Sequence, residues 1–141
     1  MSKLVDKKKE PEVELETDKP TSSLRYDEGK LRVDLVPAEI IIELARVYTA
    51  GAKKYKDNNW RDPGMKWTRC IASLERHMLK WKMGLEIDPE TQCHHLAQVA
   101  WNALTLMMYQ MQGLGTDDRW RPERFTIDED FNLIPVKKSD K

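Results

Sequence analysis

The stretch DPETQCHHLAQVAWNALTLMMYQMQG, residues 88–113, decides the fold. Its opening residues predict a helix start, because Asp88 can accept hydrogen bonds from free backbone amides and Pro89 suits the first helical position. Apolar residues recur with helical spacing on two sides of the segment, and Gly113 is a typical helix end. We therefore expect a helix from Asp88 to Gly113 at the centre of the fold, since both apolar sides need partners.

A stripe of polar residues runs along the same helix. Its members are three or four positions apart and so share one face: Thr91, His95, Gln98, Asn102, Thr105 and Tyr109. Buried polar groups need hydrogen-bonding partners. The stripe is therefore a polar network that fixes packing, a solvent-facing strip, or the lining of a functional site made by His95, Gln98 and Asn102.

Two more helices are predicted upstream, from Pro37 to about Tyr55 and from Trp67 to Gly84. Each carries one apolar stripe, made by Ile40, Leu44, Val47 and Gly51 in the first and by Trp67, Ile71, Leu74, Met78 and Trp81 in the second. Residues 56–66 hold Asn, Asp, Pro and Gly together and predict a loop. Three long helices with short connections indicate an all-α fold, a small helical bundle.

The two ends of the chain differ from this middle part. Residues 1–23 are charged and nearly free of apolar side chains, which predicts a flexible tail. Residues 24–113 form the expected helical domain, which opens on an extended segment before Pro37. Residues 114–141 predict an irregular extension, with short strands around Phe125–Ile127 and near Leu133.

The charge balance argues against two classes of partner. Lys and Arg together number 24, as do Asp and Glu, so no net field draws the chain onto duplex nucleic acid or an anionic membrane. Cys70 and Cys93 are too few for a secreted disulfide scaffold and are expected to be packed thiols. The amino terminus is charged and no long apolar run exists, so a cytoplasmic protein is expected. Three helices are few for one bundle, which predicts a homo-oligomer.

Histidines and carboxylates gather near the start of the last helix. His77 lies at the edge of an apolar stripe and His95 on the polar stripe, so they are core histidines or metal ligands. Three carboxylates, Glu86, Asp88 and Glu90, lie near the expected helix start, where they suit Mg²⁺ or Mn²⁺. The predicted metal ligands are His77, Glu86, Asp88 and His95.

Other charged and aromatic residues suit a nucleotide. Several cations suit phosphate contacts, although lysines on a helix face are usually just solvated: Arg25, Lys30, Arg32, Lys53, Lys54, Lys56, Arg69, Arg76 and Lys80. Tyr55 or Trp60 suits stacking on a base, although each can equally anchor a core. Glu39 and Glu43 share one helix face and are candidates for catalysis, although a solvated face has the same pattern.

Two runs of sequence carry a resemblance to a known family. They are RYDEGKLRVDLVPAEIIIELARVYTAGAKKYKDNNW, residues 25–60, and LERHMLKWKMGLEIDPETQCHHLAQVAWNAL, residues 74–104. Together they resemble the amino-terminal domain of the phage dATP/dGTP diphosphohydrolases over roughly residues 25–110. The resemblance implies hydrolysis of purine deoxynucleoside triphosphates to monophosphate and pyrophosphate, and we expect the predicted metal to activate the attacking water. Asn59 and Asn102 are among the matching residues and, with Gln98 of the polar stripe, are predicted nucleotide contacts. For catalysis we predict a mixed set: His77, Asp88, His95 and Glu39 or Glu43.

The chain is similar, more distantly, to the MazG-like all-α pyrophosphohydrolases. Those proteins hold metals with E-x-x-E and E-x-x-D pairs, whereas the last helix here offers His95-Leu96-Ala97-Gln98. The missing carboxylates favour an alternative function, a phage protein that binds or sequesters a nucleotide or nucleotide-derived signal without cleaving it. A purely structural oligomer is a third possibility, but it gives no reason for the polar stripe.

Overall fold

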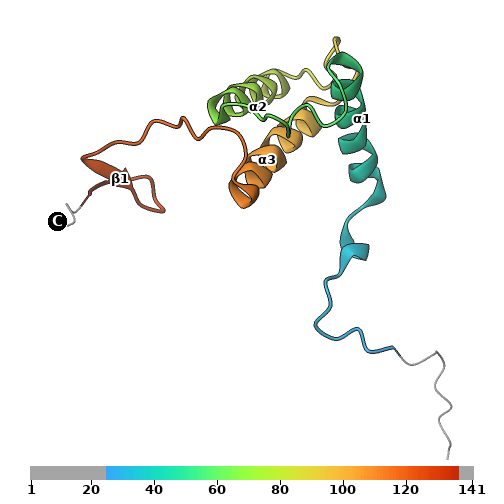
Figure 1. The fold of residues 1–141 in the computed structure, drawn as a ribbon, viewed down its shortest axis with the longest axis horizontal. Coiled ribbons are helices and arrows are strands. Elements are labelled where there is room, and N and C mark those ends of the chain that lie inside the picture. Colours follow the sequence, from blue (N-terminus) through green and yellow to red (C-terminus); the bar gives the residue numbers. More distant parts are fainter. Residues whose placement is uncertain (1–24, 137–141) are drawn as a thin grey trace, which may run out of the picture. The chain divides into compact units, whose positions relative to one another are not determined.

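A computed structural model describes residues 25–136, and helices dominate it (Figure 1). The expected all-α fold is confirmed. A 3-10 turn, η1, spans Val33–Leu35, and three helices follow: α1 at Ala38–Lys54, α2 at Trp67–Lys82 and α3 at His95–Gln112. The flexible tail predicted at residues 1–23 lies outside the described residues. Residues 25–33 belong to a unit separate from the one that begins at Asp34.

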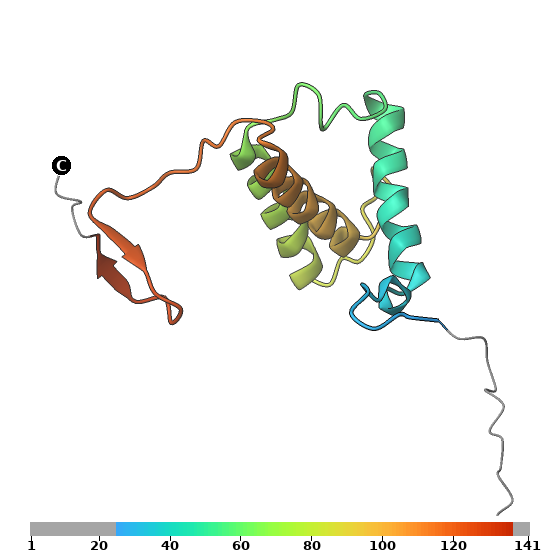
Figure 2. The same cartoon turned by 60° about the horizontal axis from the view of Figure 1, so that its bottom comes forward.

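Helix α3 contacts both α1 and α2, so the expected central position of the last helix is confirmed. Helices α2 and α3 run antiparallel, as the colours in Figure 2 show. At their shared end, the backbone amide of Trp67 donates to Thr116 O at 2.9 Å and its indole Nε1 to Leu114 O at 3.1 Å. Trp67, Cys70 and Tyr109 form the apolar core at this end.

The buried face of α3 is its polar stripe. His95, Gln98, Asn102, Thr105 and Tyr109 are the residues of this helix that lose nearly all contact with solvent. The apolar stripes expected to pack are instead partly open, and Met111 keeps 68% of its surface exposed. Polar groups occupy the interface because most of them find partners there, including Ser73, whose Oγ accepts a hydrogen bond from Asn102 Nδ2 at 3.3 Å.

The predicted start of the last helix is wrong. Helix α3 begins at His95 rather than beside Pro89, and residues 88–94 form a turn and a short bridge between Ile87 and His94. Gln92 has a φ of 58°, which an α-helix cannot accommodate. The Asp88 carboxylate accepts hydrogen bonds inside this turn instead of capping a helix.

Helix α1 spans the predicted range, but its predicted buried face is only partly confirmed. Leu44, Val47 and Gly51 are half-buried, whereas Ile40 is 60% exposed. No residue of α1 is fully buried in the single chain. Homo-oligomer formation, which would cover such a surface, stays a prediction.

The predicted strands are confirmed as a two-stranded antiparallel hairpin, β1 at Phe125–Ile127 and β2 at Leu133–Pro135. Thr126 pairs with Ile134 at its centre. Asp128 closes the turn by accepting hydrogen bonds from the backbone amides of Asp130 and Asn132. Across residues 25–136, no helix is long and apolar enough to cross a membrane.

Candidate functional site

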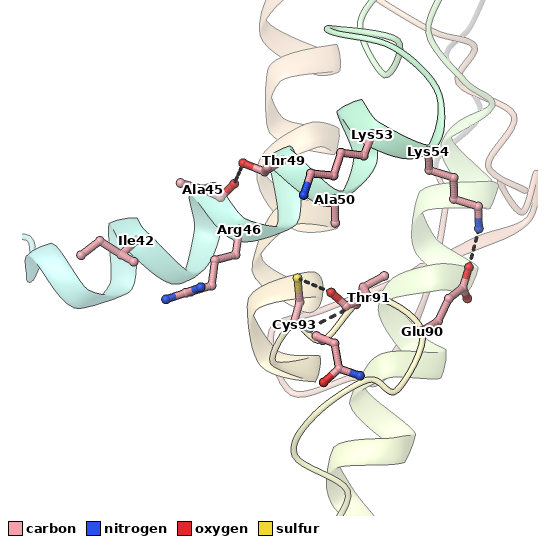
Figure 3. Close-up of a pocket in the computed structure, with 11 residues that line it drawn as sticks. Ile42, Ala45, Arg46, Thr49, Ala50, Lys53, Lys54, Glu90, Thr91 and Cys93 are labelled. Carbon is pink, nitrogen blue, oxygen red and sulfur yellow. Dashed lines mark hydrogen bonds and ion pairs between the residues drawn. The ribbon is translucent and has the colours of Figure 1, made fainter.

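An open groove of about 770 Å³ lies between α1 and the loop of residues 90–93 (Figure 3). One face of α1 supplies most of its wall, because residues spaced by three or four positions point to the same side of a helix. The α1 lining consists of Ile42, Ala45, Arg46, Thr49, Ala50, Lys53 and Lys54. The loop adds Glu90, Thr91, Gln92 and Cys93.

The groove is rich in positive charge. Arg46 and Lys53 lie on the α1 wall, each about one turn from Thr49 and Ala50, and Lys54 lies at the end of the helix. Lys54 Nζ donates to Glu90 Oε1 at 2.6 Å, and this ion pair ties α1 to the loop. The hydrogen bond to Glu90 and its charge raise the pKa of Lys54. The lining therefore carries three cations and one carboxylate.

The loop is shaped by Asp88, whose side chain is buried. Its Oδ2 accepts hydrogen bonds from Thr91 Oγ1 at 2.9 Å and from Gln98 Nε2 at 3.0 Å, and its Oδ1 accepts one from the Glu90 amide at 3.3 Å. Burial alone would raise the pKa of Asp88, but these hydrogen bonds and the nearby His77 outweigh it and hold the pKa below its ordinary value. The carboxylate thus fixes the groove loop to α3.

The Asp88→Asn variant should lose about 1 to 3 kcal/mol of unfolding free energy at pH 7, because an amide NH₂ would face a donor in place of one carboxylate oxygen. The pKa of Asp88 is lower in the folded chain than its ordinary value of 3.8. The Asp88 carboxylate therefore stabilises the fold above pH 3.8, and this stabilisation is lost as the pH falls through the folded-state pKa. Urea unfolding at pH 7 and pH 3 should show the gap between wild type and variant closing in acid. Glu75→Gln, an exposed carboxylate on α2, serves as the control and should show little difference at either pH.

His77 and His95 face each other between α2 and α3. Their Nδ1 atoms are 2.9 Å apart, and His95 is fully buried whereas His77 keeps part of its surface open. Burial and the neighbouring His95 ring lower the pKa of His77, against the opposing charge of Asp88. The second nitrogen of His95, Nε2, is buried and has no hydrogen-bond partner in the structure.

The donors around this pair do not match the Mg²⁺ site expected from the sequence. Magnesium prefers oxygen ligands, whereas the two facing donors are imidazole nitrogens, and Asp88 is engaged by three hydrogen bonds. Within the part of the chain that the structure describes, no three His, Cys, Asp or Glu side chains form a group able to hold a metal ion. The predicted Mg²⁺ or Mn²⁺ site therefore stays a prediction.

The other candidate residues lie in several places. Glu43 forms an ion pair with Arg46 at 3.1 Å, while Glu39, Tyr55 and Arg76 are exposed. Glu86 is also exposed, although its backbone oxygen accepts the amide of His95 at 2.8 Å. The remaining positions are the half-buried loop residue Asn59, the packed Trp60, and Lys30 and Arg32 in the separate unit of residues 25–33.

Trp60 packs against the core rather than lining the groove. Its ring centroid is 6.3 Å from that of Tyr109, in a stacked arrangement, and 6.0 Å from that of Tyr48, edge to face. Of the predicted nucleotide contacts, Lys54 is the one that lines the groove. The other charged residues that line the groove are Arg46, Lys53 and Glu90.

Sequence reasoning did not assign Arg46 to the site, whereas it counted Lys53 among cations that suit a triphosphate and Glu90 among carboxylates that suit a metal ion. The spacing of Arg46, Thr49 and Lys53 on one face of α1 was a usable signal. The ion pair of Glu90 with Lys54 was not predictable, because the place of Glu90 depends on the turn that replaces the expected first helical residues.

A comparison with protein families identifies the chain. Residues 20–119 match the family described as "dATP/dGTP diphosphohydrolase, N-terminal". The chain belongs to this family. The resemblance found in the sequence is thus confirmed, while the more distant likeness to MazG-like proteins stays a prediction.

A relative is known among curated proteins. The chain is similar to a dATP/dGTP diphosphohydrolase of Salmonella phage PMBT28, with 31% identity over 101 residues. The aligned region is 70% of this chain but only 34% of that relative, so the chain spans about a third of the relative's length. No solved structure matches the chain significantly.

Proposed function

We propose that this family member binds a purine deoxynucleoside triphosphate, dATP or dGTP, in the groove between α1 and the loop of residues 90–93, and hydrolyses it to the monophosphate and pyrophosphate. The observation that carries the proposal is the row of cations on the α1 wall of the groove: Arg46, Lys53 and Lys54. The family and the name of the phage relative supply the substrate class. Mg²⁺ or Mn²⁺ is proposed to enter with the nucleotide, bound to phosphate oxygens.

The groove suits a triphosphate in both size and charge. Its volume of about 770 Å³ lies within the range of ordinary small-ligand sites. Lys53 forms no ion pair within residues 25–136, so its ammonium is available to a phosphate. Arg46 is held to Glu43 through Nε, which leaves its terminal nitrogens to reach a phosphate oxygen.

Hydrolysis to pyrophosphate requires attack of a water oxygen on the α-phosphorus. The bond from that phosphorus to the bridging oxygen breaks, and pyrophosphate leaves with the negative charge. Arg46 and Lys53 would offset this charge. Glu90 is the carboxylate among the groove-lining residues, and it would accept the water's proton once Lys54 turns from Glu90 to a phosphate.

One observation favours a second candidate function, binding without turnover. No group of three metal-ligating side chains exists in the described residues. Incubation of the chain with each deoxynucleoside triphosphate and Mg²⁺ or Mn²⁺, followed by pyrophosphate detection, separates the two. Protection from thermal unfolding without pyrophosphate release would support the binding protein and contradict the hydrolase.

The double variant Arg46→Ala, Lys53→Ala should bind dATP and dGTP at least about tenfold more weakly than wild type, a loss of about 1.4 kcal/mol. The reason is the removal of two of the three groove cations. Calorimetric titration with the Mg²⁺ complex of each nucleotide measures the change. The pair Lys80→Ala, Lys82→Ala removes two exposed α2 cations outside the groove, and equal weakening in this control would show that the phosphates bind elsewhere.

Glu90→Gln separates binding from catalysis in the same assay. It keeps the size of the side chain but cannot accept a proton, so pyrophosphate release should fall about a hundredfold or more while nucleotide affinity changes little. An unchanged rate would remove Glu90 from the proposed reaction. Weaker binding at an unchanged maximal rate would assign it a purely structural role.

A homo-oligomer would cover the apolar surface of α1, where Ile40, Ile41 and Ile42 are each at least half exposed. Sedimentation of the chain at micromolar concentration tests this, and a strict monomer would contradict it. The proposed substrates are cytosolic metabolites, so a cytoplasmic place of action is part of the proposal.

A further inference from the structure

We propose that Gln92 determines the base specificity of the groove, by pairing its side-chain amide with the edge of the purine. Gln92 lies in the loop of residues 90–93 and belongs to the groove lining. The inference rests on the proposed function, because it names the group that recognises the base of the nucleotide bound there. Gln92 has no part in the proposed hydrolysis itself.

The first argument is which hydroxyl and amide side chains of the lining still have free hydrogen-bonding atoms. Three such side chains line the groove: Thr49, Thr91 and Gln92. Thr49 Oγ1 donates its proton to Ala45 O at 2.8 Å, so it keeps only an acceptor. Thr91 Oγ1 donates to Asp88 Oδ2 at 2.9 Å and accepts two further hydrogen bonds. Within the lining, Gln92 is therefore the side chain that can offer a donor and an acceptor together.

The second argument is that the amide of Gln92 has a defined orientation. Its Nε2 donates to Pro89 O at 2.9 Å. A backbone carbonyl can only accept, so the reversed amide would place two acceptors against each other. The second N–H of Nε2 and the Oε1 atom make no hydrogen bond within residues 25–136. A ligand in the groove thus meets an acceptor and a donor side by side.

The third argument is the backbone of Gln92, which has a φ of 58°. This left-handed conformation is uncommon for residues other than glycine. Two main-chain hydrogen bonds hold the turn: Gln92 N donates to Asp88 O at 2.8 Å, and Asp88 N donates to Cys93 O at 2.9 Å. Glycine would adopt this turn without strain, so the turn itself gives no reason for a glutamine. Residues held in such conformations cluster at ligand-binding sites.

The groove has a charged end and an apolar end. Its charged end is formed by the carboxyl terminus of α1 and the start of the loop: Lys53, Lys54 and Glu90. Its apolar end is at Ile42, which lies about 18 Å back along α1. In Figure 3 the loop leads from Glu90, below Lys54, to Cys93, which lies below Ala50. Gln92 directly precedes Cys93, so a nucleotide with its phosphates at the charged end would extend its base toward Gln92.

An amide can pair with either purine. Adenine presents its N6 amino donor beside a ring-nitrogen acceptor, and guanine presents its N1–H donor beside the O6 acceptor. Each pattern matches the acceptor and donor of the Gln92 amide. A carboxylate in the same place could only accept hydrogen bonds. It would favour guanine, whose N1–H and N2 amino group are neighbouring donors, over adenine, which has a single donor group on its edge.

Gln92→Glu should therefore raise the affinity for dGTP relative to dATP about tenfold or more. The α,β-methylene analogues of both nucleotides are titrated calorimetrically with Mg²⁺, so that no cleavage occurs. The added charge repels both analogues alike and cancels in the ratio. Gln110→Glu changes an exposed glutamine of α3 outside the groove lining and should leave the ratio as in wild type. An unchanged ratio in Gln92→Glu overturns the proposal.

Gln92→Gly provides a second measurement that does not strain the turn. It removes the amide and relieves the left-handed backbone, so its melting temperature should stay near that of wild type. Both analogues should bind about tenfold more weakly, the loss of one good paired contact. Inorganic tripolyphosphate has no base and should bind as it does to wild type. Equal weakening of tripolyphosphate would show that Gln92 acts on the phosphates or on the loop, and would overturn the proposal.

Tripolyphosphate also separates this inference from the proposed function. If wild type binds none of the three ligands, or the Arg46→Ala, Lys53→Ala variant binds them as tightly as wild type, the groove is not the phosphate site and both proposals fail. If that double variant weakens all three ligands while Gln92→Glu keeps the wild-type ratio, the base assignment alone fails.

Discussion

Gly115→Ala should lower the unfolding free energy by about 3 kcal/mol or more, the range reached when a substitution forces a backbone clash. A Cβ atom at this position would lie 2.3 Å from Met65 O and 3.1 Å from the Tyr109 ring, and the backbone φ is 64°. Neither neighbour can move easily, since Met65 O accepts the amide of Thr116 and Tyr109 is fully buried. Thermal unfolding should show a fall of roughly 12 °C or more for a domain of this size.

Gly113→Ala is the matched control for this prediction. Gly113 ends α3 with nearly the same backbone conformation, a φ of 65°, but nothing lies within 4 Å of its added Cβ. It should therefore show only the cost of the left-handed conformation, about 1 to 2 kcal/mol. If the two variants melt at the same temperature, the close approach of residues 64–66 to residues 114–116 does not exist in the protein.

Tyr109→Phe should cost about 1 to 3 kcal/mol of unfolding free energy while leaving the ring in place. The buried hydroxyl donates a hydrogen bond to Trp60 O and accepts one from the Met65 amide at 3.1 Å. Removing it leaves both backbone groups without that partner in the loop between α1 and α2. Urea unfolding followed by far-ultraviolet circular dichroism measures the loss.

Tyr48→Phe is the control, because Tyr48 lies beside the same Trp60 ring but makes no hydrogen bond through its hydroxyl within the described residues. Its stability should stay within about 0.5 kcal/mol of wild type. A Tyr109→Phe variant as stable as Tyr48→Phe would mean that the loop is held by ring packing alone.

Helix positions were predictable wherever the local signal and the tertiary contacts agree. The apolar stripe from Trp67 to Trp81 predicts α2, and the structure ends this helix at Lys82, just before Gly84. The start of α3 was not predictable from capping rules. Asp88 has the right chemistry for a cap, but its carboxylate instead bonds Thr91 and Gln98, a choice that depends on a residue ten positions away.

The candidate site also has features that the sequence predicts and features that it does not. The polar stripe of α3 and the pairing of His95 with His77 follow from residue type and helical spacing, together with the antiparallel packing of two helices. The groove does not follow from them. Lys54 and Glu90 are 36 positions apart, and only the fold brings their charged groups to 2.6 Å.

By itself, the sequence determined the all-α class, the three helical segments and the presence of a polar face on the last of them, because periodicity and residue chemistry are local properties of the chain. The tertiary structure alone decided that this polar face is the buried one, that residues 88–94 form a turn, and that α1 and the loop of residues 90–93 enclose a basic groove. Those outcomes depend on which distant groups satisfy the hydrogen bonds of Asp88, Gln98 and Asn102, and such partners are set by packing rather than by spacing.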